Sequence, residues 1–437
     1  MTSSRSARWL LAVMILVGLG GWAVTGLAIY TRLVYLSLLL LVGAAIWTLL
    51  SMRGIRLQRK VRTLRASMGE VFEERFEVQK ETWPGCAWLE VHNQSDLPMA
   101  AGSRLLTRLG ARQRRFYIAR SPLTRRGAFS LGPTELTSGD PFGLFTLRKR
   151  IPAEDVLVVL PMPFPISTFP PPPGLLPGGK TIHQRTLDVT PHAAGVREYV
   201  PGDPMKRIHW PSTARRGRFM VKEFEQDPQA EIWLFLDAQG EVQSALPEPP
   251  VSFSEEGWML TRRPKIDLPR DTFEYAVSAA ASLASYLLAD RRMVGLACAA
   301  GKFTVVSAER GERQVTKIME TLAFLQPEGR MPLFGLVQMQ AKLLPRGSGV
   351  ILITPSIRPD LLLAVEDLQR RNLRPVVVLI KSETFGGPRG SRKVAADLLQ
   401  RNIPVCEIGL GDDLGVRLSL PVIYFQRYNV PKVFVNA

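Results

Sequence analysis

The sequence predicts three parts in order: a two-helix membrane hairpin, a small all-β domain, and an α/β domain with a mostly parallel sheet. Three observations predict this order. Two long uncharged stretches stand near the N-terminus, short alternating apolar runs follow them, and continuous apolar runs then alternate with amphipathic segments. Of the 437 residues 46% are hydrophobic and 22% are charged, so most of the chain is expected to fold.

The first 65 residues are predicted to form the membrane hairpin, with spans at 9–30 and 33–52. One continuous helix over both stretches would be about twice as long as a ~30 Å hydrocarbon core, and Arg32 would lie near its middle. We therefore expect a turn at Thr31–Arg32, which places the Arg32 charge at the far interface.

The charges that flank the hairpin predict its orientation. Eight basic residues lie at its two outer ends and one lies in the turn, and the first 65 residues contain no acidic residue. The positive-inside rule then predicts a two-pass protein of the plasma (inner) membrane with both termini in the cytoplasm. A cleaved signal peptide is disfavoured because a second apolar run follows at once. The eight residues are Arg5, Arg8, Arg53, Arg56, Arg59, Lys60, Arg62 and Arg65.

Residues 66–160 are predicted to form a sandwich-like β domain. Alternating runs are separated by Gly, Pro, Asn and Asp clusters, which is typical of short strands joined by turns. Between Asp96 and Glu135 there are eight arginines and no acid, which predicts a basic surface that faces anionic headgroups or solvent. RNA or DNA binding is the alternative, but aromatic residues do not interleave with these arginines as a stacking surface requires. The arginines are Arg104, Arg108, Arg112, Arg114, Arg115, Arg120, Arg125 and Arg126.

A proline-rich linker is predicted at 161–180, which holds eight prolines and three glycines. An arm at 181–228 follows, and the α/β domain covers 229–437. In such sheets ligands lie at the carboxyl ends of the strands, where Asp237 ends the first one and the long loop 239–270 begins. Strands are predicted at 231–236, 293–299, 303–307, 349–354, 375–380 and 403–407, and helices at 272–289, 312–325, 333–344, 360–371 and 391–401.

The arm carries the densest motif of the sequence. Pro201-Gly202-Asp203 has the chemistry of a turn. Ile208 and Trp210 would share one face of an extended segment, and we expect Trp210 to bury itself against the edge of the α/β sheet. The arginines would then be available to a protein partner. The motif residues are Arg197, Tyr199, Pro201, Gly202, Asp203, Arg207, Ile208, Trp210, Ala214, Arg215 and Arg216.

This motif, together with Arg126-Gly127 and the run from Asp140 to Phe145, resembles domain-of-unknown-function family 58. The resemblance implies two N-terminal spans, a β domain, and an α/β domain similar to von Willebrand factor type A, which is Rossmann-like. Members of the family are associated with MoxR-type AAA+ ATPases. The resemblance therefore implies a scaffold or an assembly or chaperone accessory protein near the membrane, which works with such an ATPase.

A von Willebrand A domain binds Mg²⁺ through Asp-x-Ser-x-Ser, a Thr and a later Asp, because this cation prefers oxygen ligands. The sequence here reads Asp237-Ala-Gln239-Gly-Glu241. Asp237 is retained and both serines are replaced, so we expect a degenerate site with no bound metal and no other cofactor.

Catalytic motifs are also missing from the sequence. The four histidines form no HExxH motif and no phosphate-binding P-loop occurs. We therefore expect a membrane-anchored, non-enzymatic protein that binds the bilayer and a protein partner but no nucleic acid. A metal-dependent or thiol hydrolase at the membrane, and a basic nucleic-acid binder, are the alternatives. The thiol hydrolase would use Cys86 with His92, but the sequence offers no identifiable residue to orient the histidine.

Overall fold

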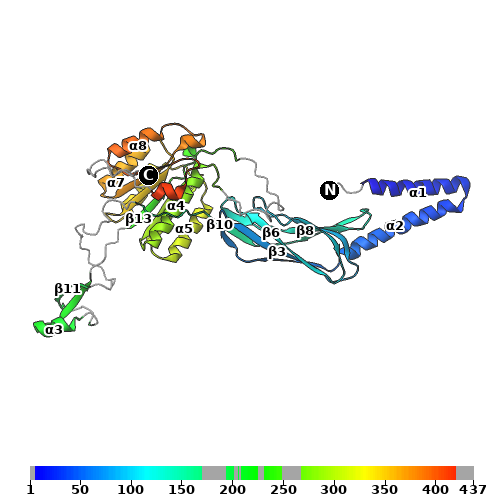
Figure 1. Ribbon diagram of the computed structural model, residues 1–437, viewed down its shortest axis with the longest axis horizontal. Helices are drawn as coiled ribbons and strands as arrows, with labels where there is room; N and C mark the ends of the chain where they lie inside the picture. Colours follow the sequence, from blue (N-terminus) through cyan, green and yellow to red (C-terminus); the bar gives the residue numbers. More distant parts are fainter. Residues whose placement is uncertain are drawn as a thin grey trace, which may run out of the picture. The chain divides into compact units, whose positions relative to one another are not determined.

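A computed structural model of the chain describes residues 5–169, 193–200, 205, 208–224, 231–248 and 267–419 (Figure 1). The chain divides into two compact units, which are described separately. The first unit comprises Met1–Pro163, Leu246–Ala281 and Met319–Leu325, and the second comprises Phe164–Ala245, Ser282–Ile318 and Gln326–Ala437.

Two antiparallel helices, α1 (Arg5–Thr25) and α2 (Ala28–Met52), open the first unit (Figure 1). α2 has 25 residues and is long and apolar enough to cross a membrane, whereas the apolar part of α1, Trp9–Thr25, is shorter. The expected turn at Thr31–Arg32 is wrong. The chain reverses at Gly26, whose φ of 64° is accessible to glycine, and Arg32 lies exposed in the second turn of α2.

Small residues bring α1 and α2 into close contact. A Cβ atom on Gly18 would lie 2.6 Å from Val34 Cγ2, and one on Gly21 would lie 2.4 Å from the Tyr30 ring. Glycine is thus required at both positions for this approach, as at the interfaces of membrane helices.

Three sheets follow, so the predicted all-β region is confirmed. It begins with β1 at Ile55, earlier than the expected boundary at 66, because residues 55–61 pair in full with β3. The sheet orders are β1-β3-β6, β2-β10-β7 and β5-β4-β8-β9. The strands are β1 (Ile55–Val61), β2 (Arg65–Ser67), β3 (Val71–Lys80), β4 (Cys86–Asn93), β5 (Arg104–Leu109), β6 (Arg114–Pro122), β7 (Gly127–Ser130), β8 (Thr134–Gly139), β9 (Thr146–Ile151) and β10 (Val156–Leu160).

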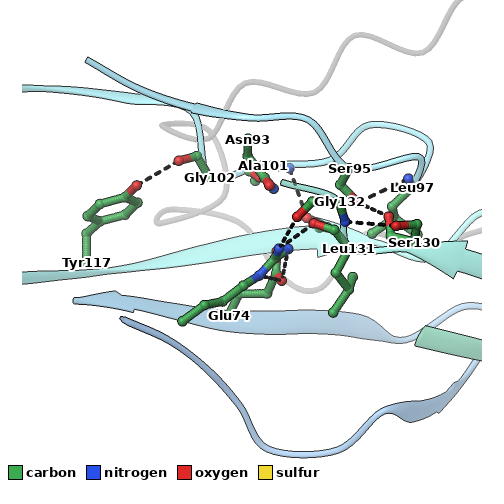
Figure 2. A network of polar contacts seen from close by, with 12 residues as sticks. Glu74, Asn93, Ser95, Leu97, Ala101, Gly102, Tyr117, Ser130, Leu131 and Gly132 are labelled. Atoms are coloured by element: carbon green, nitrogen blue, oxygen red, sulfur yellow. Dashed lines mark hydrogen bonds and ion pairs between the residues drawn. The ribbon is translucent and has the colours of Figure 1, made fainter. Parts of the chain in front are cut away.

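The basic stretch after α2 is therefore part of a sheet, and much of it is paired with acids. Arg59 is buried in an ion pair with Glu74 and also donates to the carbonyls of Leu131 and Gly132. Figure 2 shows three residues that bind this guanidinium, Glu74, Leu131 and Gly132. Burial raises the pKa of Glu74, and the neighbouring Arg59 opposes that rise. Three further basic residues of the stretch form ion pairs as well: Arg56 with Glu81, Lys60 with Glu77, and Arg65 with Glu320.

Polar contacts join α2 firmly to the β region. The ammonium group of Lys80, a residue with no exposed surface, donates to the carbonyls of Leu50, Ser51 and Arg53 at the end of α2. Thr82 Oγ1 donates to Arg53 O at 2.7 Å. A lysine that binds the last carbonyls of a helix also interacts favourably with its dipole.

Six of the eight arginines between residues 96 and 135 are exposed, as the predicted basic surface requires, but three of these six are paired with acids. Acids from other segments pair with them: Glu77 with Arg114, Glu73 with Arg120 at 2.9 Å, and Glu248 with Arg125 at 3.2 Å. Arg126 is buried and pairs with Glu274. Arg108 and Arg112 remain exposed.

The second unit is built on a six-stranded sheet of order β15-β14-β13-β16-β17-β18. The predicted alternation of strands and helices is confirmed. The sheet is mixed. β14, β13, β16, β17 and β18 pair in parallel, whereas β15 runs antiparallel to β14 after a tight turn at Gly301. The strands are β13 (Ile232–Leu236), β14 (Val294–Ala300), β15 (Lys302–Glu309), β16 (Gly349–Thr354), β17 (Arg374–Ile380) and β18 (Val405–Ile408).

One face of this sheet packs against three helices, which bury Leu336, Leu368 and Leu398 in one cluster with Phe235 and Leu352. The helices are α6 (Leu333–Gln340), α7 (Asp360–Arg370) and α8 (Ser391–Gln400). Helix α9 (Leu414–Ser419) also belongs to this unit, whereas α4 (Thr272–Ala289) and α5 (Glu312–Phe324) are each divided between the two units.

The first part of the predicted linker 161–180 is fixed rather than free. Phe164 N donates to Ser282 Oγ at 2.8 Å, and Thr168 Oγ1 donates to Ser419 O at 3.0 Å. Phe169 is 5% exposed. Residues 170–180 lie outside the part of the chain that the structure describes.

Candidate functional site

The motif residues belong to a small arm, defined here as residues 193–224. β11 (Ala193–Glu198) pairs antiparallel with β12 (Met220–Phe224), and α3 (Trp210–Arg216) precedes β12 (Figure 1). Ser212 N donates to His209 Nδ1 at 3.3 Å, which caps the start of α3. Gly217, with a φ of 66°, ends it.

Ile208 and Trp210 do not share a face. Ile208 is 6% exposed, forms a bridge with Val221 and lies beside the buried Met220. Trp210 is the first residue of α3 and is 63% exposed. The expected burial of Trp210 is therefore wrong: the chain turns into a helix there, so the two-residue alternation of a strand no longer applies.

The other motif residues are placed as follows. Tyr199 donates its backbone N–H to Phe219 O at 2.8 Å, and the two rings meet edge-on. Arg197 lies opposite Val221 in the hairpin. Ala214, Arg215 and Arg216 are exposed on α3. The predicted turn at Pro201, Gly202 and Asp203, and Arg207, lie outside the described residues.

A second cluster lies where β13 and β16 end. The strand order reverses between these two strands, and such a switch point is where open α/β sheets bind ligands. Asp237 is 2% exposed. Thr354 Oγ1 donates to its Oδ2 at 2.6 Å, and Gln239 N donates to its Oδ1 at 3.1 Å. The sequence predicted the place of Asp237, while its bond to Thr354 depends on the pairing of distant strands.

Burial raises the pKa of Asp237 to about 6, because desolvation of the carboxylate outweighs the hydrogen bonds from Thr354 and Gln239. The nearby carboxyl of Asp360 raises it further, and Arg358 opposes that rise. The ionised carboxylate of Asp237 therefore costs folding free energy at neutral pH.

This cost predicts a pH dependence. The unfolded carboxyl ionises near pH 3.8 and the folded one near 6, so the chain should lose about 2 kcal/mol of stability relative to Asp237→Asn as pH rises from 4 to 7. Denaturant unfolding of both proteins across this range measures the difference. Thr354→Val, which removes a donor to the ionised form, should move the loss to higher pH. Parallel profiles for the chain and Asp237→Asn would contradict the buried ionisation.

The residues at this strand end do not fit the magnesium ion that the family resemblance implies. Both carboxylate oxygens of Asp237 already accept hydrogen bonds. Where the serines would stand, Gln239 donates its amide to Glu241, and Glu241 pairs with Arg358 at 3.1 Å. The second carboxylate, that of Glu241, is thus neutralised by Arg358, and the guanidinium brings a positive charge to the place where the metal ion would bind. Mg²⁺ requires free oxygen ligands in an octahedral arrangement.

The motif residues upstream of the arm have structural roles in the first unit. Asp140 has no exposed surface, and its carboxylate accepts the N–H groups of Phe142 at 2.8 Å and Phe145 at 2.6 Å. It thus closes the turn between β8 and β9. Arg126 donates to Leu322 O at 3.0 Å and to Leu325 O at 2.7 Å, at the end of α5. The motif identified both residues in the sequence, but it did not predict their hydrogen-bond partners.

Comparisons with known proteins support the family resemblance. Residues 195–244, which run from β11 past Asp237, match the family model described as Protein of unknown function DUF58. The chain is also 24% identical over 252 residues to the Uncharacterized protein YeaD of Bacillus subtilis (strain 168). That match covers 56% of this chain and 54% of the relative, so the chain spans about half the length of the curated relative it matches.

Among solved structures, a chain from the complex of Zinc 2-glycoprotein and prolactin inducible protein from human seminal plasma matches 25% of this chain over 97% of its own length. The identity is 13% and the TM-score is 0.18. A likeness this small supports no statement about fold or function.

Proposed function

We propose that this chain is a membrane-anchored, non-enzymatic scaffold or assembly accessory protein whose arm binds a protein partner. The proposal rests on one observation above all, the exposure of large apolar side chains in the arm. Val200 is 57% exposed, Met205 72%, Trp210 63% and Phe219 54%. Solvent-exposed tryptophan and phenylalanine close to arginines are the residue types that are enriched at protein interfaces.

The charges of the arm indicate the kind of partner. Arg215 and Arg216 end α3, and Arg218 follows at once. None of the seven residues of α3 is buried, so both arginines are available to another molecule. We propose an acidic protein surface with an apolar pocket as the partner. The family resemblance makes a MoxR-type AAA+ ATPase the first candidate.

Apolar helix α2 supports the membrane anchor, and the hairpin charges support the proposed cytoplasmic side for both of its outer ends. The thiols support a non-enzymatic role. Cys86, Cys298 and Cys406 are all buried, and burial raises the pKa of Cys86 and raises that of Cys406 to about 12. A nucleophilic thiol requires the opposite shift.

Charge reversal in the arm tests this function. Arg215→Glu with Arg216→Glu is expected to abolish capture of the partner from detergent-solubilised membranes, and Trp210→Ala should weaken it strongly. Both variants should keep the melting temperature of the unmodified chain, because none of these side chains is buried. Affinity capture followed by identification of the copurified proteins makes the measurement.

The matched control is Arg392→Glu with Lys393→Glu, another adjacent basic pair on the exposed side of a helix, α8. It makes the same change in net charge away from the arm. If capture survives both the charge reversals in the arm and Trp210→Ala, the partner binds elsewhere on the chain. The same conclusion follows if the α8 double variant abolishes capture equally.

A further inference from the structure

Three loops of the β region lie along the last turns of α2. The β3–β4 loop is fixed there because Thr82 and Cys86 bind the carbonyls of Arg53 and Ser51. The β5–β6 turn lies beside it, since Lys80 N donates to Gln113 O at 3.0 Å. A Cβ atom on Gly85 would lie 2.4 Å from Leu109 O, so these two loops are in direct contact.

The third loop, the β8–β9 turn, lies directly against the helical hairpin. The Asp140 carboxylate holds its backbone, and Leu144, which is 4% exposed, packs with Leu11 of α1 and Ala44 of α2. Phe142, at the tip of the same turn, is 63% exposed. The turn thus presents one apolar side chain to the helices and another to the surroundings.

The contact with Ala44 gives the depth of this turn. Ala44 precedes the end of α2 at Met52 by eight residues, or about 12 Å along the helix axis. The 25 residues of α2 are about 37 Å long, about 7 Å more than a ~30 Å hydrocarbon core. In a membrane crossed by α2, the turn therefore reaches the boundary between headgroups and acyl chains even when the whole excess length protrudes on this side.

The side chains exposed on the three loops match that boundary. Trp83 in the β3–β4 loop is 77% exposed, and aromatic side chains prefer the headgroup level. Arg108 and Arg112 beside the β5–β6 turn are exposed, and Arg108 lines a surface pocket together with Trp47 of α2. Arginines at this level pair with lipid phosphates.

We propose that this end of the β region lies in the headgroup layer of an anionic bilayer, with Trp83 and Phe142 among the lipids and Arg108 and Arg112 at the phosphates. The inference rests on the proposed membrane anchor. It adds a second membrane contact, which fixes how the β region stands on the bilayer.

Spin-label depth measurements test this arrangement on the full chain in nanodiscs of phosphatidylcholine with and without phosphatidylglycerol. A nitroxide is attached at Trp83→Cys, Phe142→Cys, Leu39→Cys or Glu73→Cys; the three native cysteines are buried and react slowly. Labels at 83 and 142 should lose access to a water-soluble nickel complex and gain access to oxygen. The label at 73 should stay aqueous, because Glu73 lies about 24 Å back along β3 from Lys80.

The label at 39, on an exposed position in the middle of α2, separates this inference from the anchor itself. An aqueous signal at 39 would overturn the membrane anchor and with it the proposed function. A hydrocarbon signal at 39 with aqueous signals at 83 and 142 would overturn only the second contact. Arg108→Gln with Arg112→Gln should make the label at 142 more aqueous in anionic nanodiscs, and an unchanged signal there would exclude phosphate binding by these arginines.

Discussion

Lys80→Met is expected to destabilise the first unit by about 3 to 5 kcal/mol. Methionine keeps the length and apolar stem of lysine but donates no hydrogen bond. The carbonyls of Leu50, Ser51 and Arg53 at the end of α2 then lose the buried ammonium group that donates to all three. Each carbonyl keeps one other donor, namely Arg53 N for Leu50, Cys86 Sγ for Ser51 and Thr82 Oγ1 for Arg53, so the loss is that of the bonds to the ammonium group. A hydrogen bond to a charged group contributes about 1.5 to 3 kcal/mol. For a unit of this size the melting temperature should fall on the order of 10 °C.

Thermal unfolding of the full chain in detergent measures this loss, and trypsin cleavage after Arg53 gives a local readout. The carbonyl of Arg53 is held by Lys80 and Thr82, so the variant should be cut faster at that bond. Lys393→Met on the exposed side of α8 is the matched control, and it should change neither quantity. If Lys80→Met has the same melting temperature and the same cleavage rate as the unmodified chain, then water replaces the ammonium group without loss of stability.

Arg126→Met is expected to be destabilising by a similar amount, about 3 to 5 kcal/mol, because it leaves the buried Glu274 carboxylate without its cation. The same guanidinium binds Leu322 O and Leu325 O and lies over the Phe273 ring at 5.1 Å from its centroid. Burial already raises the pKa of Glu274, and Arg126 is the group that opposes that rise. Arg126→Lys should recover only part of the loss, since an ammonium group cannot span a carboxylate and two carbonyls as a planar guanidinium does.

A double-mutant cycle identifies the ion pair as the cause. Glu274→Gln removes the buried charge, so Arg126→Met should cost less in that background than in the unmodified chain. Denaturant midpoints of the four proteins give the coupling free energy. Additive costs would mean that Arg126 acts through the carbonyls of Leu322 and Leu325 and that its pairing with Glu274 contributes nothing.

The order of the elements could be predicted from the sequence because it depends on local patterns. Strand β16 and helix α4 have the bounds that periodicity predicts, 349–354 and 272–289. The position of Asp237 at a strand end follows in the same way. The turn of the hairpin also depends on a local residue. That residue is Gly26, which can adopt a positive φ, and not the charged Arg32 on which the prediction rested.

The boundaries between units could not be predicted from composition. Residues 246–281 and 319–325 belong to the first unit, although the sequence predicts them as part of the α/β domain. Arg126 binds Glu274, Leu322 and Leu325, and these partners lie more than a hundred residues along the chain. No local pattern contains a contact of that separation.

The sequence by itself determined the helices, the strands, the basic excess at the N-terminus and the residues of the arm motif, because each is encoded by near neighbours. Only the tertiary structure decided which charges are exposed. Arg59 and Arg126 appear in the sequence as members of basic runs and are buried in ion pairs, whereas Arg108 and Arg112 remain exposed. The physical reason is that a charge is stabilised inside a protein by a partner, and strand pairing brings that partner from a distant part of the chain.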